Sequence, residues 1–229
     1  MTMTSRPGRR RRVRSIRRLV GLGMAAALTI GLAQNTTTAA FSGQTVDTGN
    51  RASTAATFCT TPGTTAPPLT VAMDAAAYEV QPGNNYSATP IGVGTGATGD
   101  AYTYLKFPRA PVPPRCTVTA ATLYVYARTP TAPATIDVYR AGGPWDNTLT
   151  WNSPRPGWAG TAVSTAVSAS AGWLQWTVTT LTQELYAGTD YGFLLKDSVD
   201  HHPTVTRYQT WESRESDLTK AAYLVVSWG

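Results

Sequence analysis

The sequence has little charge, only two cysteines and no long hydrophobic run. Charged residues make up 14% of its 229 residues, against a usual quarter, which argues against a coiled coil, a charged-tail protein or a strongly disordered chain. The signatures GxSxG, HExxH and the EF-hand loop are missing, so no familiar hydrolase, metalloprotease or calcium loop can be recognised. The length suits one domain, or one domain with a tail.

Acidic residues are absent before Asp47, whereas eight of the 19 basic residues lie before position 20. The formal net charge of +6 therefore belongs to the N-terminal segment, because residues 41–229 contain 11 basic and 13 acidic side chains, a net charge of −2. A basic protein would suggest a nucleic acid or an anionic membrane as partner. Since the excess positive charge is confined to the N-terminal segment, we expect no nucleic-acid partner.

The N-terminal segment has the layout of a secretory signal peptide. Its arginines precede an apolar stretch at 19–33, and the small residues Thr38, Ala39 and Ala40 follow. About 15 weakly apolar residues are too few for a membrane span, which needs ~20. The sequence therefore predicts a signal peptide over 1–40, a secreted, extracellular protein, and no membrane partner after cleavage. An uncleaved signal anchor is the alternative.

Cys59 and Cys116 are the only cysteines, so within the chain they can pair only with each other. Export to an oxidising compartment favours a disulfide between them. In the loop-closure model, a bridge over this separation contributes roughly 4 kcal/mol to stability. Once the bridge forms, no thiol remains for a metal cluster or a nucleophile.

Composition divides the remainder of the chain at about residue 69. Small polar residues fill 41–57, and the Thr/Pro-rich stretch at 60–68 is typical of a linker, so we assign 41–68 to a polar N-terminal segment and linker, and 69–229 to the folded domain. Short stretches separated by Gly, Pro, Asn and Asp predict strands at 69–73, 91–95, 101–107, 118–127, 135–140, 148–151, 161–168, 173–178, 191–196, 208–212 and 223–228.

One short helix is predicted among these strands. Thr180 and Gln183 fit a capping box with Thr180 as the N-cap, and Gly188 suits a left-handed stop after Ala187. A helix of this length crosses one end of a sheet and does not form a layer. About ten strands and one short helix predict an all-β fold, a β-sandwich.

Two local patterns resemble functional motifs. The glycines of 94–99 satisfy GxGxxG, but a strand-like stretch follows where a dinucleotide site needs a helix, so we predict a hairpin loop. His201 and His202 are adjacent, so on a strand or a helix they point in different directions and do not suit one metal ion. A loop could bring them toward Asp197 and Asp200, but we expect a solvated loop and no metal site.

Paired carboxylates could carry out glycoside hydrolysis by acid and base catalysis. The candidates are Glu212, Glu215, Asp217 and, beside Trp145, Asp146. A β-sandwich offers such pairs by chance, and no feature of the sequence distinguishes one of them. We therefore expect no catalytic residue.

Aromatic residues are the most conspicuous feature, with 7 Trp and 11 Tyr but only 4 Phe. Trp and Tyr combine a flat apolar face with a hydrogen-bonding tip, which suits contact with sugar rings, although they also fill the cores of sandwiches. Trp176 shares a strand face with Leu174 and Val178, so we expect it in the core. Tyr124 and Tyr126 lie opposite the apolar face of their strand and are candidates for a binding platform.

Several segments, taken in order, resemble one family. They are Asp74, Tyr78, Pro82-Gly83-Asn84-Asn85-Tyr86, Tyr104-Leu105-Lys106-Phe107, 113–126, Val138-Tyr139-Arg140, Trp145, Leu149-Thr150-Trp151-Asn152, Pro156, 172–179, 190–196, Ser213-Arg214-Glu215 and 223–226. The series resembles the secreted DNRLRE domain, grouped with carbohydrate-binding module family 96, over about residues 70–229. The mature start at 40–50 resembles the start of camelysin-like secreted matrix proteins.

The resemblance implies a jelly-roll β-sandwich that binds polysaccharides, often acidic ones, without catalysis. We expect no cofactor, and a structural calcium ion is left open. We expect contacts with the glycan at Tyr78, Lys106, Tyr124, Tyr126, Arg128 and Arg140. The family commonly carries basic residues before a Leu-x-Arg-Phe strand, whereas this chain has Asp100 there and Lys106 at the Arg position. An acidic and a neutral polysaccharide therefore both stay open as ligands.

Three functions are compatible with the sequence. The leading hypothesis is a secreted, non-catalytic polysaccharide-binding module. The second is a cell-envelope or matrix protein with protein partners, in which the segment 41–56 adds as a strand to the sheet edge of a neighbour. The third is a hydrolase or lyase that works through paired carboxylates.

Overall fold

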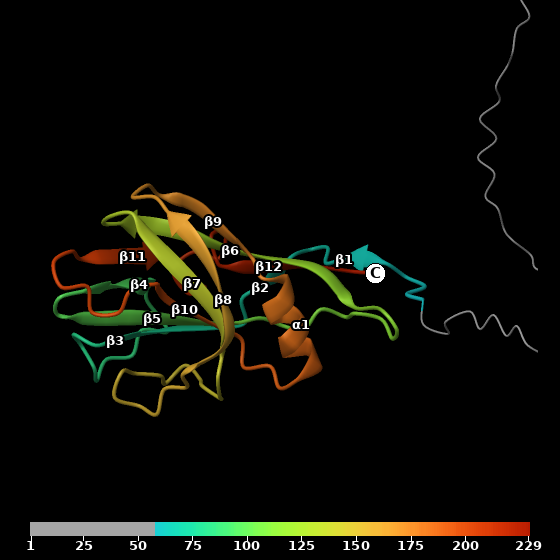
Figure 1. Cartoon of the computed structure of the whole chain (residues 1–229), viewed down its shortest axis with the longest axis horizontal. Helices are drawn as coiled ribbons and strands as arrows, with labels where there is room; N and C mark the ends of the chain where they lie inside the picture. Colours follow the sequence, from blue (N-terminus) through green and yellow to red (C-terminus); the bar gives the residue numbers. More distant parts are fainter. Residues whose placement is uncertain (1–57) are drawn as a thin grey trace, which may run out of the picture. The chain divides into compact units, whose positions relative to one another are not determined.

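The structure, a computed structural model, describes residues 58–229 (Figure 1). The predicted signal peptide, the polar residues 41–57 and the camelysin-like start lie outside the described residues. The described part forms twelve strands and one helix: β1 Gly63–Thr64, β2 Leu69–Thr70, β3 Met73–Tyr78, β4 Ile91–Gly96, β5 Gly99–Lys106, β6 Val118–Pro130, β7 Ala134–Ala141, β8 Trp158–Val167, β9 Gly172–Thr177, α1 Thr179–Ala187, β10 Phe193–Asp197, β11 Arg207–Trp211 and β12 Tyr223–Trp228.

The strands form one curled antiparallel sheet in the order β1-β12-β6-β11-β4-β5-β10-β7-β8. Strand β2 adds to β12, β3 adds to β5, and β9 adds to β6. Because the sheet curls, β6, β9 and β12 lie across the core from β5 and β10, with α1 beside them (Figure 1). The predicted all-β sandwich with one short helix is confirmed.

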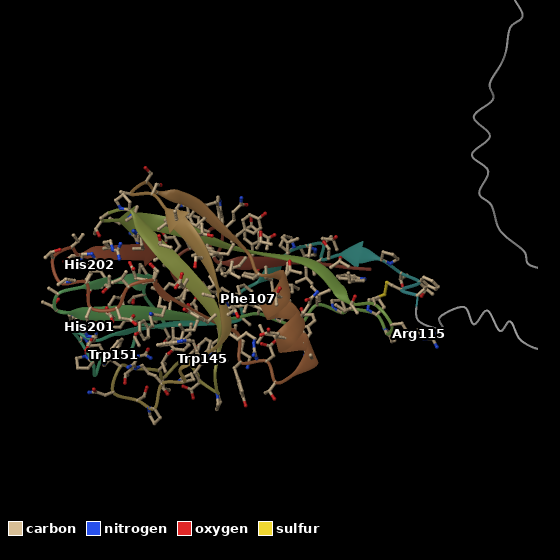
Figure 2. The ribbon with its side chains drawn as sticks, viewed as in Figure 1. Phe107, Arg115, Trp145, Trp151, His201 and His202 are labelled. Atoms are coloured by element: carbon tan, nitrogen blue, oxygen red, sulfur yellow. A yellow bond between two sulfur atoms is a disulfide. The ribbon has the colours of Figure 1, made fainter. Side chains whose placement is uncertain are left out.

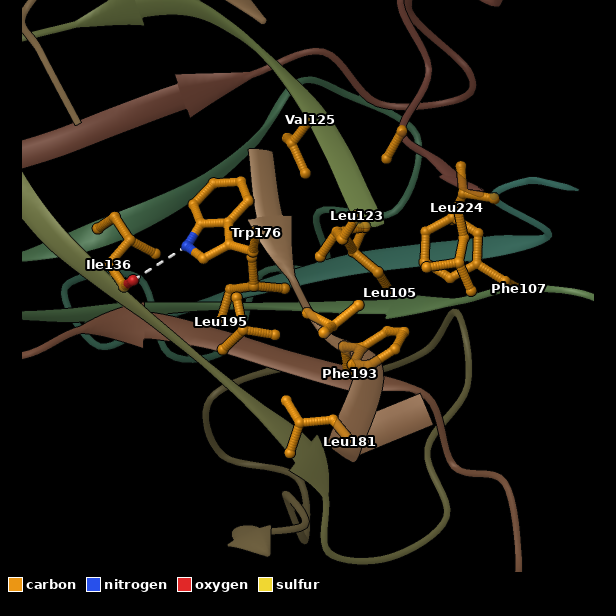
Figure 3. Packing of buried hydrophobic residues seen from close by; sticks show 14 of the residues in the cluster. Leu105, Phe107, Leu123, Val125, Ile136, Trp176, Leu181, Phe193, Leu195 and Leu224 are labelled. Carbon is orange, nitrogen blue, oxygen red and sulfur yellow. Dashed lines mark hydrogen bonds between the residues drawn. The ribbon is translucent and has the colours of Figure 1, made fainter. Parts of the chain in front are cut away.

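The hydrophobic core fills the space between the two layers. Leu123 and Val125 of β6 are fully buried and pack in one cluster with Leu105 of β5 (Figure 3). Trp176 is 1% exposed and donates its indole N–H to the Ile136 carbonyl at 3.1 Å. The predicted inward face of β6 and the core position of Trp176 are confirmed, and removal of these side chains from water is the main driving force for folding.

A second, smaller cluster covers the outer face of β3, β5 and β10. The long connection 142–157 between β7 and β8 folds over this face, and its Leu149 packs against Tyr104 and Leu194. The Tyr104 hydroxyl donates to the Pro156 carbonyl at 2.9 Å, and the Trp145 indole donates to the Tyr191 carbonyl at 2.6 Å. Figure 2 shows Trp145 and Trp151 on this side of the molecule. This outer face is therefore closed by the protein itself.

The predicted strand at 148–151 is wrong, because this stretch belongs to the connection 142–157. The Asp146 carboxylate accepts hydrogen bonds from the Thr148 backbone N–H and hydroxyl, at 2.7 and 2.6 Å. Thr150 and Ser153 bond to the backbone of each other. These local bonds compete with the ladder that a strand would need.

The predicted helix is present as α1 and ends at Ala187 as predicted, but its N-cap residue and the conformation of Gly188 differ from the prediction. Val178 is the N-cap and no side chain caps the helix, so Thr180 lies inside the first turn. Gln183 donates to the Val118 carbonyl at 2.7 Å instead of closing a capping box. Gly188 is extended, with φ −124°, instead of left-handed. The Gln183 amide therefore ties the start of the helix to β6 and is not available for a local capping box.

The N-terminal end of the described chain joins the sheet. Cys59 and Cys116 form the predicted disulfide (Figure 2, near Arg115). Strand β1 pairs with β12 at Gly63 and Trp228, and a Cβ atom at Gly63 would lie 2.8 Å from the Trp228 ring, so the close approach requires glycine. Part of the Thr/Pro-rich stretch thus extends the sheet. Within residues 58–229, no helix has the length and apolar character to cross a membrane.

Candidate functional site

The outward face of β12, β6 and β9 carries a group of aromatic side chains. Tyr124 lies opposite Tyr223 of β12, and Tyr126 lies opposite Trp173 of β9. Because side chains alternate along a strand, the inward Leu123 of β6 leaves its tyrosines on the outer side. We call Tyr124, Tyr126, Trp173 and Tyr223 the aromatic face.

The four rings of the aromatic face touch one another. Tyr124 and Tyr223 stack, with centroids 4.6 Å apart and planes 14° apart. Trp173 packs edge-on against Tyr223 at 5.1 Å and against Tyr126 at 5.4 Å. Trp173 is 44% exposed, and the three tyrosines are half-buried. The result is a continuous aromatic surface with one prominent indole.

Within residues 58–229, the hydroxyl groups of these tyrosines have no hydrogen-bond partner. Among residues 58–229, no hydrogen bond joins the hydroxyls of Tyr124, Tyr126 or Tyr223 to another residue. A phenol that keeps its hydroxyl in water can both stack on a sugar ring and exchange hydrogen bonds with sugar hydroxyls. The aromatic face therefore has the chemistry of a saccharide platform.

Two cations border the aromatic face, and each has a carboxylate partner. Arg128 lies 3.6 Å from Glu212, and Lys220 lies 3.2 Å from Asp217 while its ammonium sits 5.1 Å from the centre of the Tyr126 ring. The hydrogen bond to Asp217 raises the pKa of Lys220, so the lysine is charged at neutral pH. The border of the face is thus close to neutral.

The structure places the six predicted contact residues on different strands. Tyr124, Tyr126 and Arg128 share the outer side of β6. The other three lie apart from it: Tyr78 ends β3, Lys106 ends β5, and Arg140 lies on β7.

Tyr78, Lys106 and Arg140 mainly contact other residues of the same chain. Tyr78 packs edge-on against Tyr86 at 4.5 Å, and burial raises the pKa of its phenol. The Arg140 guanidinium donates to Glu184 of α1 at 2.6 Å. Lys106 pairs with Met73 across β5 and β3 and is half-buried. The three do not form a common surface with the aromatic face.

Sequence reasoning missed Tyr223 and Lys220 and left Trp173 unassigned. The alternation of Tyr223 with the buried Leu224 and Val226 is a signal that could have placed this tyrosine outside. The signal for Trp173 is weaker, because only the pairing of β9 with β6 brings it to Tyr126. Lys220 lies in a loop, where no periodicity exists.

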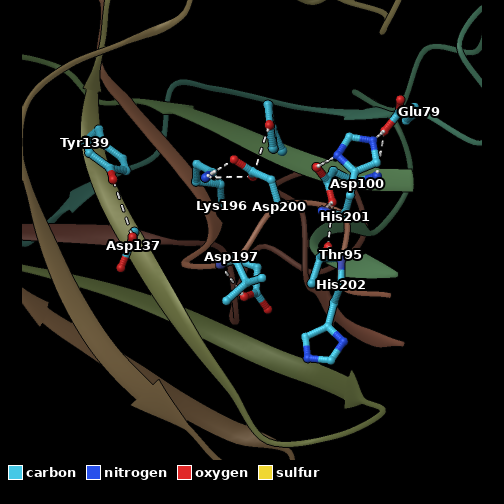
Figure 4. Close-up of polar contacts among 12 residues, drawn as sticks. Glu79, Thr95, Asp100, Asp137, Tyr139, Lys196, Asp197, Asp200, His201 and His202 are labelled. Atoms are coloured by element: carbon cyan, nitrogen blue, oxygen red, sulfur yellow. Dashed lines mark hydrogen bonds and ion pairs between the residues drawn. The ribbon is translucent and has the colours of Figure 1, made fainter. Parts of the chain in front are cut away.

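A second aromatic cluster lies where the connection 142–157 covers the sheet. The Arg155 guanidinium stacks over Trp151 at 3.6 Å, and the Lys196 ammonium lies 4.9 Å from the centre of the Trp158 ring. Here the polar groups are already engaged, because Tyr102 donates to Asp200 and Lys196 is ion-paired with the same carboxylate at 2.7 Å (Figure 4). Trp158 is 47% exposed, but the cluster mainly holds the connection in place.

The carboxylates considered for catalysis have other engagements. Glu212 is 6% exposed, accepts from the Ser216 hydroxyl at 2.7 Å and pairs with Arg128. Glu215 neighbours Asp74, where burial, together with the negative charge of Glu215, raises the pKa of the Asp74 carboxyl to about 7. Such a pKa suits acid–base catalysis, but Asp74 is only 2% exposed and so is closed to a polymer.

The sandwich thus carries an aromatic, nearly uncharged face whose chemistry suits ring-shaped polar ligands. The model of carbohydrate-binding module family 96 matches residues 65–228, and the chain belongs to this family. This finding confirms the predicted carbohydrate-binding module family 96 and supports carbohydrate as the partner. A comparison with curated proteins gave no match.

Proposed function

We propose that the protein is a secreted, non-catalytic polysaccharide-binding module of the DNRLRE type, and that the aromatic face holds the glycan. The observation that carries this proposal is that the rings of Tyr124, Tyr126, Trp173 and Tyr223 touch one another on one outward surface. The hydroxyls of the three tyrosines have no hydrogen-bond partner within residues 58–229. Sugar C–H groups pack on the exposed Trp173 indole, and the tyrosine hydroxyls bond to sugar hydroxyls.

The charges at this surface favour a neutral polysaccharide. Both bordering cations form ion pairs with carboxylates, so an acidic polymer gains little attraction from them. The carboxylates of Glu212 and Asp217 would also repel it. Residues 41–229 carry a net charge of −2, which offers no long-range attraction to a polyanion. Binding then rests on stacking and hydrogen bonds.

Secretion and the absence of catalysis complete the proposal. The arginine-rich start, the apolar stretch at 19–33 and the disulfide between Cys59 and Cys116 together support export to an oxidising compartment. The engaged carboxylates described above support binding without bond cleavage.

The test is an affinity-gel panel with the disulfide-bonded protein, in which gels contain neutral or acidic polysaccharides, followed by a reducing-end assay on each polymer. We expect retardation by at least one neutral polymer and no new reducing ends. Release of product would assign a hydrolase or lyase instead. No retardation by any polymer would contradict the proposal and favour a protein partner in the cell envelope or matrix.

A further inference from the structure

Three ligand-type side chains meet at the end of the sheet formed by β3, β4 and β5. Glu79 directly follows β3, Asp100 lies near the start of β5, and His201 lies in the connection 198–206 between β10 and β11 (Figure 4). One ligand atom from each residue lies within 4.8 Å of the others. Segments far apart in the sequence thus converge on one small space.

The imidazole of His201 lies between the two carboxylates. Its Nε2 atom is 2.9 Å from Glu79 Oε2, and its Nδ1 atom is 3.2 Å from Asp100 Oδ2. His201 has φ +48°, a left-handed conformation that is uncommon for a residue other than glycine. Backbone bonds hold it there, because the His201 N–H donates to Asp100 Oδ1 at 2.9 Å and the His202 N–H donates to Thr95 Oγ1 at 3.0 Å.

Asp100 points a buried carboxylate oxygen into this space. The residue is 1% exposed, and its Oδ1 atom accepts from the Thr95 hydroxyl at 2.6 Å and from the His201 N–H. Its Oδ2 atom is buried and accepts no hydrogen bond among residues 58–229, and its nearest polar neighbour of opposite character is the His201 Nδ1 atom at 3.2 Å. A buried carboxylate oxygen without a donor is costly unless a cation compensates it.

The carboxylates are also held in position before any ligand arrives. Glu79 Oε2 accepts the Asp100 backbone N–H at 3.0 Å, while Thr95 fixes the other oxygen of Asp100. Hydrogen bonds of this kind orient the side chains around a metal ion and strengthen their hold on it. The arrangement is therefore ordered as a ligand set.

We propose that Glu79, Asp100 and His201 bind a divalent transition-metal ion of the Zn²⁺ type. One imidazole nitrogen and two carboxylate oxygens suit zinc, with water at a fourth position, since His201 and Glu79 face solvent in part. Calcium is disfavoured because it takes six to eight oxygen ligands. The two negative charges of the site match the charge of the ion.

The sequence predicts a solvated loop without a metal ion at His201 and His202, and this proposal departs from that prediction. Sequence reasoning considered His201 with its neighbour His202, whereas the ring of His202 lies elsewhere, with Nδ1 accepting from the Val205 N–H at 3.1 Å. The long-range partners Glu79 and Asp100 are invisible without the fold. A bound ion would fix the connection 198–206, whose Asp200 holds Lys196 and Tyr102.

The test is calorimetric titration of ZnCl₂ into tag-free, metal-stripped protein with its disulfide intact, without carbohydrate. We expect uptake of one ion, and weakening by at least tenfold in Glu79→Gln and in His201→Ala. His202→Ala is the matched control on the same loop and should keep the affinity of the unchanged protein. Zinc should raise the melting temperature of the unchanged protein and of His202→Ala, but not that of Glu79→Gln.

Several results would overturn the site. The first is the absence of both a heat of binding and a shift in melting temperature at about 1 mM zinc. The second is a loss of zinc affinity in His202→Ala equal to that in His201→Ala. The third is an unchanged zinc affinity in Glu79→Gln. Tighter binding of CaCl₂ than of ZnCl₂ would overturn the class of ion. Circular dichroism checks folding, and Glu79→Gln alone decides if His201→Ala does not fold.

Discussion

The rings of Tyr124 and Tyr223 stack across neighbouring strands, with centroids 4.6 Å apart and planes 14° apart. Trp173 closes one side of this pair at 5.1 Å from Tyr223. Because each ring is held by its neighbours, the aromatic face is ordered before a glycan binds, which lowers the entropy lost on binding. A rigid face also means that its members can be tested one at a time.

Trp176, on the same strand as Trp173, should affect stability and not recognition. It is 1% exposed and hydrogen-bonded to Ile136, so Trp176→Ala leaves a cavity and should lower the free energy of unfolding by ~3–5 kcal/mol. Urea unfolding measures the change. Trp173→Ala is the matched variant and should cost less than about 1 kcal/mol. Equal losses in the two variants would contradict the assignment of inner and outer faces.

The disulfide should contribute strongly to stability. Cys59 and Cys116 are 57 residues apart in sequence, and in the loop-closure model a bridge over this distance restricts the unfolded chain by ~4 kcal/mol. In the double variant Cys59→Ser, Cys116→Ser, the free energy of unfolding measured with urea should be lower by that amount. A loss below about 1 kcal/mol would show that the bridge adds little to the strand pairing of β1 and β2 with β12.

Stability should fall as pH rises from about 4 to about 7, in part because of Asp74. Burial and the charge of Glu215 raise the pKa of this carboxyl from 3.8 to about 7 in the folded protein. In that window the folded state keeps a proton that the unfolded state releases, so ionisation costs stability, by up to ~4 kcal/mol above pH 8. Asp74→Asn mimics the protonated form and should remove this part of the pH dependence.

The measurement compares thermal unfolding of the two proteins from about pH 4 to about pH 8. Asp74→Asn should melt higher than the unchanged protein at the alkaline end and similarly at the acidic end. Asp217→Asn is the control, because hydrogen bonds from Thr219 and Lys220 lower the pKa of this half-buried carboxyl instead of raising it. Parallel curves for Asp74→Asn and the unchanged protein would rule out a raised Asp74 pKa.

Binding of a neutral polysaccharide should depend little on salt. The cations nearest the aromatic face are paired with Glu212 and Asp217, so few counterions are exchanged on binding. Affinity-gel retardation should change less than about twofold between about 50 mM and about 500 mM NaCl. A loss of tenfold or more would contradict a site that binds by stacking and hydrogen bonds.

Period-two patterns allowed most of the strands to be predicted from the sequence. In β6 the buried Leu123 and Val125 alternate with Tyr124 and Tyr126, so both the strand and its faces follow from local order. The stretch 148–151 failed because Asp146 and Ser153 bond to nearby backbone groups, and such local bonds carry no periodic signal.

The candidate site was predictable only in part. Tyr124, Tyr126 and Arg128 follow from one strand, whereas Trp173 and Tyr223 join them through strand pairings that span about 50 and about 100 residues. Local patterns do not specify such pairings, because register depends on which strands meet. The contact of Arg140 with Glu184 of the helix is another long-range pairing that the sequence does not reveal, so Arg140 was predicted as a glycan contact.

The most direct test of the central claim compares Trp173→Ala with Trp158→Ala on a polysaccharide that retards the unchanged protein. Both tryptophans are similarly exposed, at 44% and 47%, but only Trp173 belongs to the aromatic face. Trp173→Ala should weaken binding by at least tenfold, about 1.4 kcal/mol, and Trp158→Ala should leave it within twofold. Unchanged binding in Trp173→Ala, with loss in Trp158→Ala, would contradict the account and place the glycan at the connection 142–157.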